Sequence, residues 1–235
     1  MSVKIGHSSI DEGGGISGGQ PGDQTGREVR LDRWWQGGWT LLLRPAERSA
    51  AEKMAAACEA GCRNEHIGYC QGHRNDLRAQ ARAANWDLSK IKTPTECACS
   101  SFMAVCAEAA GIDMGAAYTG ANAPATFQMR SQYAKTGAFQ ILTDSRYLTS
   151  DRYLRRGDIL VNEARHTVMV LEDGSDAAEK NGEIILNGKT YPIDRLLVGG
   201  KNYFAIRELA EVLQAAGVCT LKVSSRGNVA VLETK

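Results

Sequence analysis

The sequence has no excess of charge of one sign and no long apolar run. Its 28 Lys and Arg residues balance 27 Asp and Glu residues, so the net charge is +1. A general nucleic-acid binder needs a strongly basic surface, and a disordered chain usually carries a large net charge, so both classes are excluded. Because the charge is balanced, we expect no nucleic-acid partner. No stretch of roughly 18 apolar residues occurs, so we expect no membrane insertion.

The chain also lacks a recognisable export signal and a disulfide pattern. The first residues, Met1 to His7, contain no apolar core and no small-residue cleavage site, so we expect synthesis in the cytoplasm without a signal peptide. The 7 cysteines are odd in number, and a chain of 235 residues is too long for a small disulfide scaffold. We therefore expect reduced thiols.

What is present predicts an α+β protein of two domains. Glycines crowd the first part of the chain, up to Gly38, which excludes a helix there and favours short strands and tight turns. Hydrophobic periodicity then predicts strands at 27–31, 39–43, 157–161 and 167–171, and helices at 46–63, 75–84, 99–110 and 126–136. Ser49 and Glu52 have the spacing of a capping box for the first helix.

A polar stretch at 176–182 predicts a linker between a domain of residues 1–175 and a small domain of residues 183–235. The small domain has a ββαββ pattern. Its first hairpin turns at Asn187-Gly188, its helix covers 205–216, and its closing hairpin turns near Arg226.

Cys99 carries the strongest chemical signal, because it stands at the start of a predicted apolar helix. Backbone N–H groups and the helix dipole stabilise a thiolate at such a position. A thiolate nucleophile also needs a base, and His166 directly precedes an apolar strand that would hold its imidazole. A buried structural cysteine is the alternative interpretation of Cys99 by itself.

The order of three segments resembles the NlpC/P60 and CHAP cysteine peptidases, which are papain-like peptidoglycan hydrolases. These segments are Cys99 to Phe102, Arg156 to Val161, and His166 to Val170. Residues 1 to about 175 also resemble the catalytic region of phage or prophage endolysins, including the stretches 6–12 and 22–26. The resemblance implies a papain-like fold with Cys99 as nucleophile and His166 as general base.

Two features depart from that pattern. The residue before the nucleophile is usually Asp in NlpC/P60 enzymes, and here it is Ala98. The third polar residue, which family members carry on the strand after the His strand, has no counterpart, because the polar linker follows. We hypothesise that the N-terminal segment folds back and supplies a third residue or substrate contacts. The candidates are His7, Asp11, Glu12, Asp23 and Gln24.

Alternatives exist for these candidates. The three acidic ones are also typical turn residues. His7 lies in a segment that itself resembles a His-bearing strand, so it is a rival to His166 as the base.

Other residues invite weaker interpretations. Cys58, Cys62 and Cys70 lie near two histidines, His66 and His73, but their spacing is not that of a zinc finger, so we expect no metal and no cofactor. A second set consists of three tryptophans, which could stack on sugar rings but are expected to be core residues: Trp34, Trp35 and Trp39.

The small domain resembles the copper-amine-oxidase N-terminal-like domain through residues 185–189 and 203–211. The resemblance implies an accessory or cell-wall-binding module. Residues 183–235 hold no His and a single Cys219, so copper is not implied.

The sequence thus predicts an endolysin that hydrolyses an amide bond of peptidoglycan, as a stem-peptide endopeptidase or an N-acetylmuramoyl-L-alanine amidase. The resemblance implies action on the wall after holin-mediated release. One alternative, favoured by Ala98, is a non-catalytic wall-binding or phage structural protein on the same scaffold. Another is a cysteine transferase or deamidase with a protein substrate.

Overall fold

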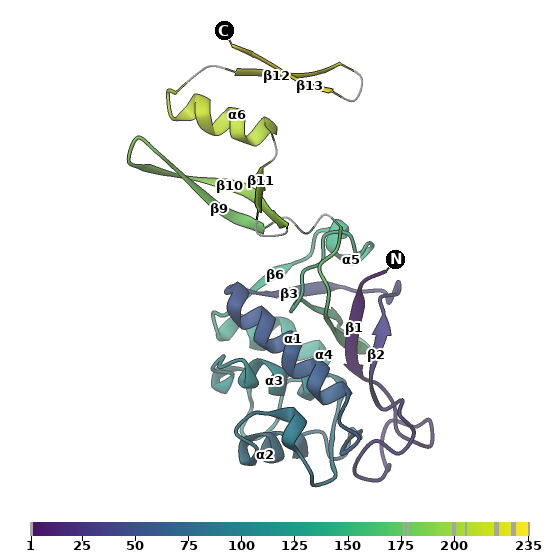
Figure 1. Cartoon of the computed structure of the whole chain (residues 1–235). Coiled ribbons are helices and arrows are strands. Elements are labelled where there is room, and N and C mark those ends of the chain that lie inside the picture. Colours follow the sequence, from purple (N-terminus) through teal and green to yellow (C-terminus); the bar gives the residue numbers. More distant parts are fainter. Residues whose placement is uncertain are drawn as a thin grey trace. The chain divides into compact units, whose positions relative to one another are not determined.

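The computed structural model describes residues 2–175, 177, 179–198, 201–204, 206–218, 221–226 and 229–234. The chain divides into two compact units, Met1–Ser175 and Asp176–Lys235 (Figure 1). Each unit is described by itself. Within the described ranges, no helix is both long and apolar enough to cross a membrane.

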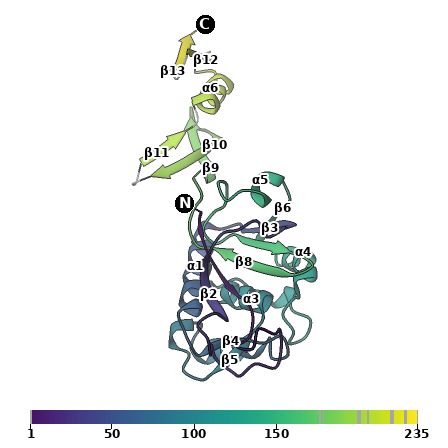
Figure 2. The ribbon, with the colours of Figure 1, turned by 90° about the vertical axis from the view of Figure 1, so that its right-hand side faces the viewer.

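The first unit is built on a six-stranded antiparallel sheet in the order β2-β1-β8-β7-β3-β6. Its strands are β1 (Lys4–Ser8), β2 (Val29–Arg33), β3 (Leu41–Pro45), β6 (Phe139–Leu142), β7 (Ile159–Asn162) and β8 (His166–Val170). Strand β1, the first in the chain, lies between β2 and β8, the last strand of the unit (Figure 2). The predicted α+β class is confirmed, with a mostly antiparallel sheet.

Five α-helices accompany this sheet: α1 (Arg48–Cys62), α2 (Asp76–Ala83), α3 (Cys99–Ala109), α4 (Thr126–Lys135) and α5 (Ser145–Leu148). Short 3-10 turns cover Leu88–Lys90 and Gly115–Ala117. The first four helices fall within the predicted ranges. Helix α1 has Glu47 as its N-cap and no side-chain cap, so the capping box predicted at Ser49 is wrong.

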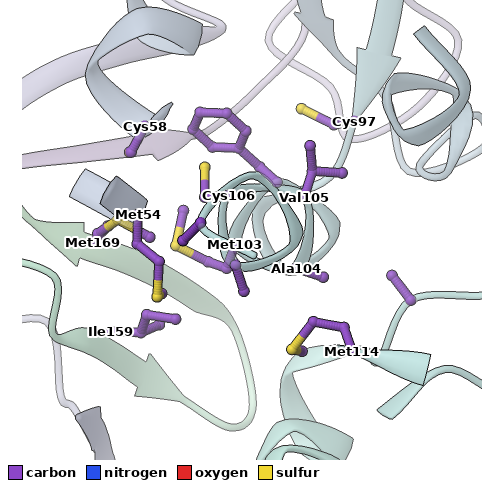
Figure 3. Close-up of a cluster of buried hydrophobic side chains, with 14 of the residues drawn as sticks. Met54, Cys58, Cys97, Met103, Ala104, Val105, Cys106, Met114, Ile159 and Met169 are labelled. Carbon is purple, nitrogen blue, oxygen red and sulfur yellow. The ribbon is translucent and has the colours of Figure 1, made fainter. Parts of the chain in front are cut away.

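Helix α3 forms the centre of the main core. Its residues from Cys99 to Ala107 are all buried, including the polar Ser100 and Ser101. Around it pack Met54 and Cys58 of α1, and Ile159 and Met169 of the sheet (Figure 3).

The other face of the sheet has its own smaller core. Val168 and Val170 pack there with Leu160, and Tyr147 of α5 covers them. Because side chains alternate along a strand, Met169 packs in the main core while its two neighbours pack in the smaller one. This alternation decides which residues of β1 and β8 share a face.

A small parallel sheet leads into α3. Strand β4 (Ile67–Tyr69) pairs with β5 (Thr95–Cys97), in the register Tyr69 to Cys97. Strand β5 ends one residue before the N-cap of α3, so this two-stranded sheet positions the start of that helix.

The second unit contains β9 (Glu179–Leu186), β10 (Lys189–Val198), β11 (Lys201–Phe204), α6 (Ile206–Ala215), β12 (Leu221–Arg226) and β13 (Val229–Thr234). The hairpin of β9 and β10 turns at Asn187 and Gly188, which both have positive φ, as the sequence predicted. Two details differ from the predicted pattern. Strand β9 begins at Glu179, inside the predicted linker, and β11 adds a strand before the helix.

Candidate active site

Cys99 is the first residue of α3, and the chain enters the helix through Ala98. The N-cap Ala98 is extended, with φ −100° and ψ 169°, and its methyl group cannot cap the helix. Ser101 takes part in the turn instead, because its Oγ accepts the N–H of Ala98 at 2.9 Å. The turn thus closes without the acid that is usual before the nucleophile in the resembled family.

The sulfur of Cys99 lies against backbone N–H groups and out of solvent. The N–H groups of Thr167, Ser100 and Cys99 itself face it, and the residue is 4% exposed. Burial nevertheless outweighs these donors and raises the pKa of the Cys99 thiol. Burial thus acts against the thiolate stabilisation that the position at a helix start predicts, while the N–H groups act in its favour.

His166 and His7 meet across the two strands that flank this point. His7 is on β1, His166 opens β8, and the pairing of these strands joins Ile5 to Val170 and Gly6 to Met169. Just beyond that pairing, His7 Nδ1 lies 2.9 Å from His166 Nε2, and the rings meet edge to face at 76°. The structure therefore brings His7, His166 and the β8 backbone next to Cys99 into one region.

Both imidazoles are neutral at ordinary pH. Burial, then the charge of Arg30, lowers the pKa of His166 to about 4. Burial, then the charges of His166 and Arg30, lowers the pKa of His7 to about 3, and Asp32 only partly opposes this. Neutral rings can accept a proton, which is what a general base requires.

Arg30 and Asp32 form the outer partners of His7. Arg30 Nε lies 3.4 Å from His7 Nε2, Asp32 Oδ2 lies 3.9 Å from it, and the two charged side chains pair at 3.1 Å. Sequence analysis missed both residues. The signal was the alternation of β2, which places 30 and 32 on one face, opposite His7 once β1 pairs with β2.

The Trp35 ring packs beside the rings of His7 and His166. Its ring stacks near that of His166, with an interplanar angle of 24° and 6.4 Å between centroids, and lies 5.5 Å from that of His7. Trp39 is buried and Trp34 packs on the smaller core, as expected for core residues, but Trp35 is 36% exposed.

The remaining N-terminal candidates serve their own loop rather than the histidines. Asp11 accepts the N–H of Gly15 at 2.6 Å, Glu12 accepts the N–H of Gln20 at 2.7 Å, and Asp23 accepts the N–H of Gly26 at 2.7 Å. Gln24 Nε2 donates to Pro21 O at 3.1 Å. These contacts match the alternative in which the acidic residues are turn residues.

The six cysteines in the described ranges are free thiols, and they separate into distinct environments. The sulfurs of Cys58 and Cys62 lie next to Gly6 of β1. Cys70 instead joins His73 and Glu96 in a compact cluster. Glu96 was not among the residues predicted from the sequence. The spacing of Cys70 and His73 is a recognisable signal, but the three-residue strand β5 that brings Glu96 to them is not.

Comparison with known proteins assigns the first unit to a family. The family model described as an endolysin-like domain matches residues 5–177. Searches of curated proteins and of solved structures found no match. The matched range includes β1 with His7, α3 with Cys99 and β8 with His166, and the family indicates a cell-wall lytic function with peptidoglycan as substrate. The chain belongs to the endolysin-like domain family.

Proposed function

We propose that the chain is a cysteine hydrolase of peptidoglycan, with Cys99 as nucleophile, His166 as general base and His7 as the residue that positions His166. The observation that carries this proposal is the 2.9 Å contact between His7 Nδ1 and His166 Nε2. This contact engages one ring nitrogen of His166 and leaves Nδ1 for a proton from Cys99 or the substrate.

The reaction follows from these roles. His166 Nδ1 takes the Cys99 proton as the sulfur attacks the carbonyl carbon of the scissile amide. Backbone N–H groups at the start of α3 donate hydrogen bonds to the developing oxyanion. The carbon–nitrogen bond then breaks, and His166 returns its proton to the leaving amine. Water, deprotonated by His166, hydrolyses the thioester and regenerates the thiol.

The mechanism needs one tautomer of the histidine pair. His166 Nδ1 can accept a proton only when Nε2 carries the other one and donates it to His7 Nδ1. His7 then bears its proton on Nε2, where Asp32 Oδ2 is the nearby acceptor at 3.9 Å. Arg30 is a donor at the same nitrogen, so the balance between Arg30 and Asp32 sets how often this tautomer forms.

The sheet order supports an NlpC/P60-like arrangement with an altered chain order. In the resembled family the third residue lies on the strand after the His strand. Here the spatial neighbour of β8 is β1, so the start of the chain supplies His7 at that place. We propose a papain-like site on this basis. Endopeptidase and amidase cleavage use the same chemistry and both remain within the proposal.

A second function is favoured by one observation. Cys99 is 4% exposed and its thiol pKa is raised, which also suits a wall-binding protein on an inactive scaffold. Such a protein would bind walls without releasing fragments.

The test is clearance of purified Gram-positive cell walls by the wild type, Cys99→Ser and His166→Ala, with mass spectrometry of the released fragments. Cys62→Ser is the matched control, because its Sγ donates to Arg30 O at 3.3 Å and a hydroxyl can do the same. We expect clearance by the wild type and Cys62→Ser, and a loss of roughly 10³-fold or more in the other two.

Fragment masses will distinguish cleavage in the stem peptide from cleavage at muramic acid. Full clearance by folded Cys99→Ser would remove the proposed nucleophile. Wall binding by the wild type without any released fragment would establish the binding function instead.

A further inference from the structure

A second cluster of reactive side chains lies outside the histidine pair. Cys70 follows β4, His73 lies in the next turn, and Glu96 is in β5. One ligand atom from each of the three lies within 4.8 Å of the others, and His73 Nδ1 is 2.7 Å from Glu96 Oε2. The parallel pairing of β4 with β5 creates this proximity, since Cys70 N–H donates to Cys97 O at 3.0 Å.

The sulfur of Cys70 is surrounded by backbone donors. Gly18 N–H lies 3.5 Å from it, and the N–H groups of Gly72 and His73 also face it. Such donors stabilise a metal-bound thiolate and orient it, as the outer contacts of metal ligands generally do. Cys70 and His73 have two residues between them, a spacing that lets adjacent ligands share one ion.

A separate observation points to a cation ligand. The Glu96 side chain is 2% exposed, and its Oε1 has no hydrogen-bond partner among the residues that the structure describes. Glu12 Oε2 is also buried without a partner in that part of the chain, and Glu12 is close enough to Glu96 for their charges to interact. Buried carboxylate oxygens are normally paired or coordinate a metal.

We propose that Cys70, His73 and Glu96 bind one Zn²⁺ ion. A thiolate, an imidazole and a carboxylate together suit zinc better than the harder Mg²⁺ or Ca²⁺. The His73 side chain is 59% exposed, so the ion faces solvent on that side and water completes its coordination. This site revises the expectation, drawn from spacing alone, that the chain binds no metal.

The ion would link the glycine-rich N-terminal segment, which includes Ile16 and Gly18, to the start of α3. Gly18 contacts the Cys70 sulfur, and Gln71 N–H donates to Ile16 O at 2.8 Å, so this segment already rests on the turn that holds the ligands. Glu96 lies three residues before Cys99 in the sequence. Zinc at this place therefore positions β5 and the first turn of α3.

The same three side chains could instead form a proton relay with Cys70 as a nucleophile. Cys70 is 0% exposed, which argues against direct attack on a polymeric substrate. The experiment must nevertheless separate the two interpretations.

The test is titration of the reduced, chelator-stripped full chain with Zn²⁺ alone, in competition with a chromophoric chelator. We expect one equivalent of zinc per chain, and a loss of affinity in His73→Ala larger than the roughly 10- to 100-fold that loss of an outer contact costs, because His73 is a direct ligand. His66→Ala is the matched control, because His66 is an exposed histidine in the turn just before β4 and lies outside the cluster. We expect it to bind like the wild type.

A second readout identifies the sulfur ligand. Co²⁺ in place of zinc should give a thiolate-to-metal absorption band that is lost in Cys70→Ser and kept in Cys62→Ser. Absence of zinc binding by the wild type, or equal losses in His73→Ala and His66→Ala, would overturn the proposal. If the wild type binds no zinc and folded Cys70→Ser no longer clears walls, the proton relay replaces the zinc site.

Discussion

At the level of single residues, the proposed site consists of Cys99, the buried His7 and the half-buried His166, and the relation between the two histidines depends on strand order. The likeness of short motifs predicted Cys99 and His166, and His7 was one of five candidates for a third residue. No pattern along the chain could select His7, because its contact with His166 arises only when β1 inserts beside β8. Trp35 was expected in the core, and its place beside the two histidine rings arises from the same arrangement of strands.

Replacing His7 tests its positioning role. We expect His7→Ala to lower kcat for wall cleavage by roughly 10²-fold with little change in KM, since His166 loses the partner that fixes its tautomer. His7→Asn should recover part of the rate, because its amide oxygen can accept a hydrogen bond from the Nε2–H group of His166. The pH profile of kcat should shift in His7→Ala. An unchanged profile, with activity and stability falling together, would indicate a merely structural residue.

The histidine pair also makes stability depend on pH. Burial lowers the pKa from 6.5 to about 3 for His7 and to about 4 for His166, whereas both rings titrate near 6.5 when unfolded. Between about pH 6.5 and pH 4 the unfolded chain binds more protons than the folded one. The free energy of unfolding therefore rises with pH in this window and falls on acidification, each pKa unit being worth about 1.4 kcal/mol.

Thermal unfolding from pH 7 to pH 4.5 checks this dependence. The wild type should lose more stability on acidification than His7→Asn, which removes one buried titrating ring. Because Arg30, Asp32 and His166 surround His7 in both proteins, the difference between them isolates that ring. Parallel curves for the two proteins would contradict the assignment of neutral buried histidines.

At the scale of elements, the strongly periodic segments were predictable and the short ones were not. Helices α1 to α4 fall where apolar residues recur at helical spacing. Strands β4 and β5 have three residues each, too few to show alternation, and their pairing comes from tertiary packing. The proposed zinc site depends on this pairing, and its residue Glu96 was therefore not predicted.

The Gly-Asp-Ile-Leu motif at the start of β7 has a structural role in the sheet. Asp158 is buried and accepts two hydrogen bonds from Arg44 of β3, at 2.8 Å and 2.6 Å, and one from the Arg155 N–H at 2.8 Å. The pair ties the entry of β7 to its neighbour β3 in the sheet.

We expect Asp158→Asn to lower the free energy of unfolding by about 3–5 kcal/mol, because it leaves the Arg44 charge buried and unmatched. Glu172→Gln is the control: it weakens the exposed pair with Lys4, at 2.9 Å, and should cost less than about 1 kcal/mol. Urea unfolding of both variants measures the difference. Equal, small losses would show that the buried pair is not needed for the fold.

At the scale of the whole molecule, the chain comprises an endolysin-like unit and a small unit after it. The family match ends at residue 177, close to the unit boundary, and leaves the small unit outside it. The sequence predicted the two-domain division from a change in pattern. The wall-binding role of the second unit stays a proposal that rests on its resemblance to the copper-amine-oxidase N-terminal-like domain.

Shortening the chain tests that role. A protein ending at residue 178 keeps the whole matched range and the buried Ala177. We expect it to cleave soluble peptidoglycan fragments at a rate close to that of the full chain, but to sediment with intact walls about 10-fold less well, since binding through two linked modules exceeds binding through one. Undiminished sedimentation would remove the accessory role.

The proposed nucleophile Cys99 forms a covalent acyl intermediate with peptidoglycan. Acid quenching of the full chain during turnover of soluble wall fragments, followed by peptide mapping by mass spectrometry, detects this intermediate. We expect a thioester adduct on Cys99, with increased occupancy when His7→Asn slows deacylation. An adduct on Cys70, or continued cleavage of fragments by folded Cys99→Ser, would contradict it.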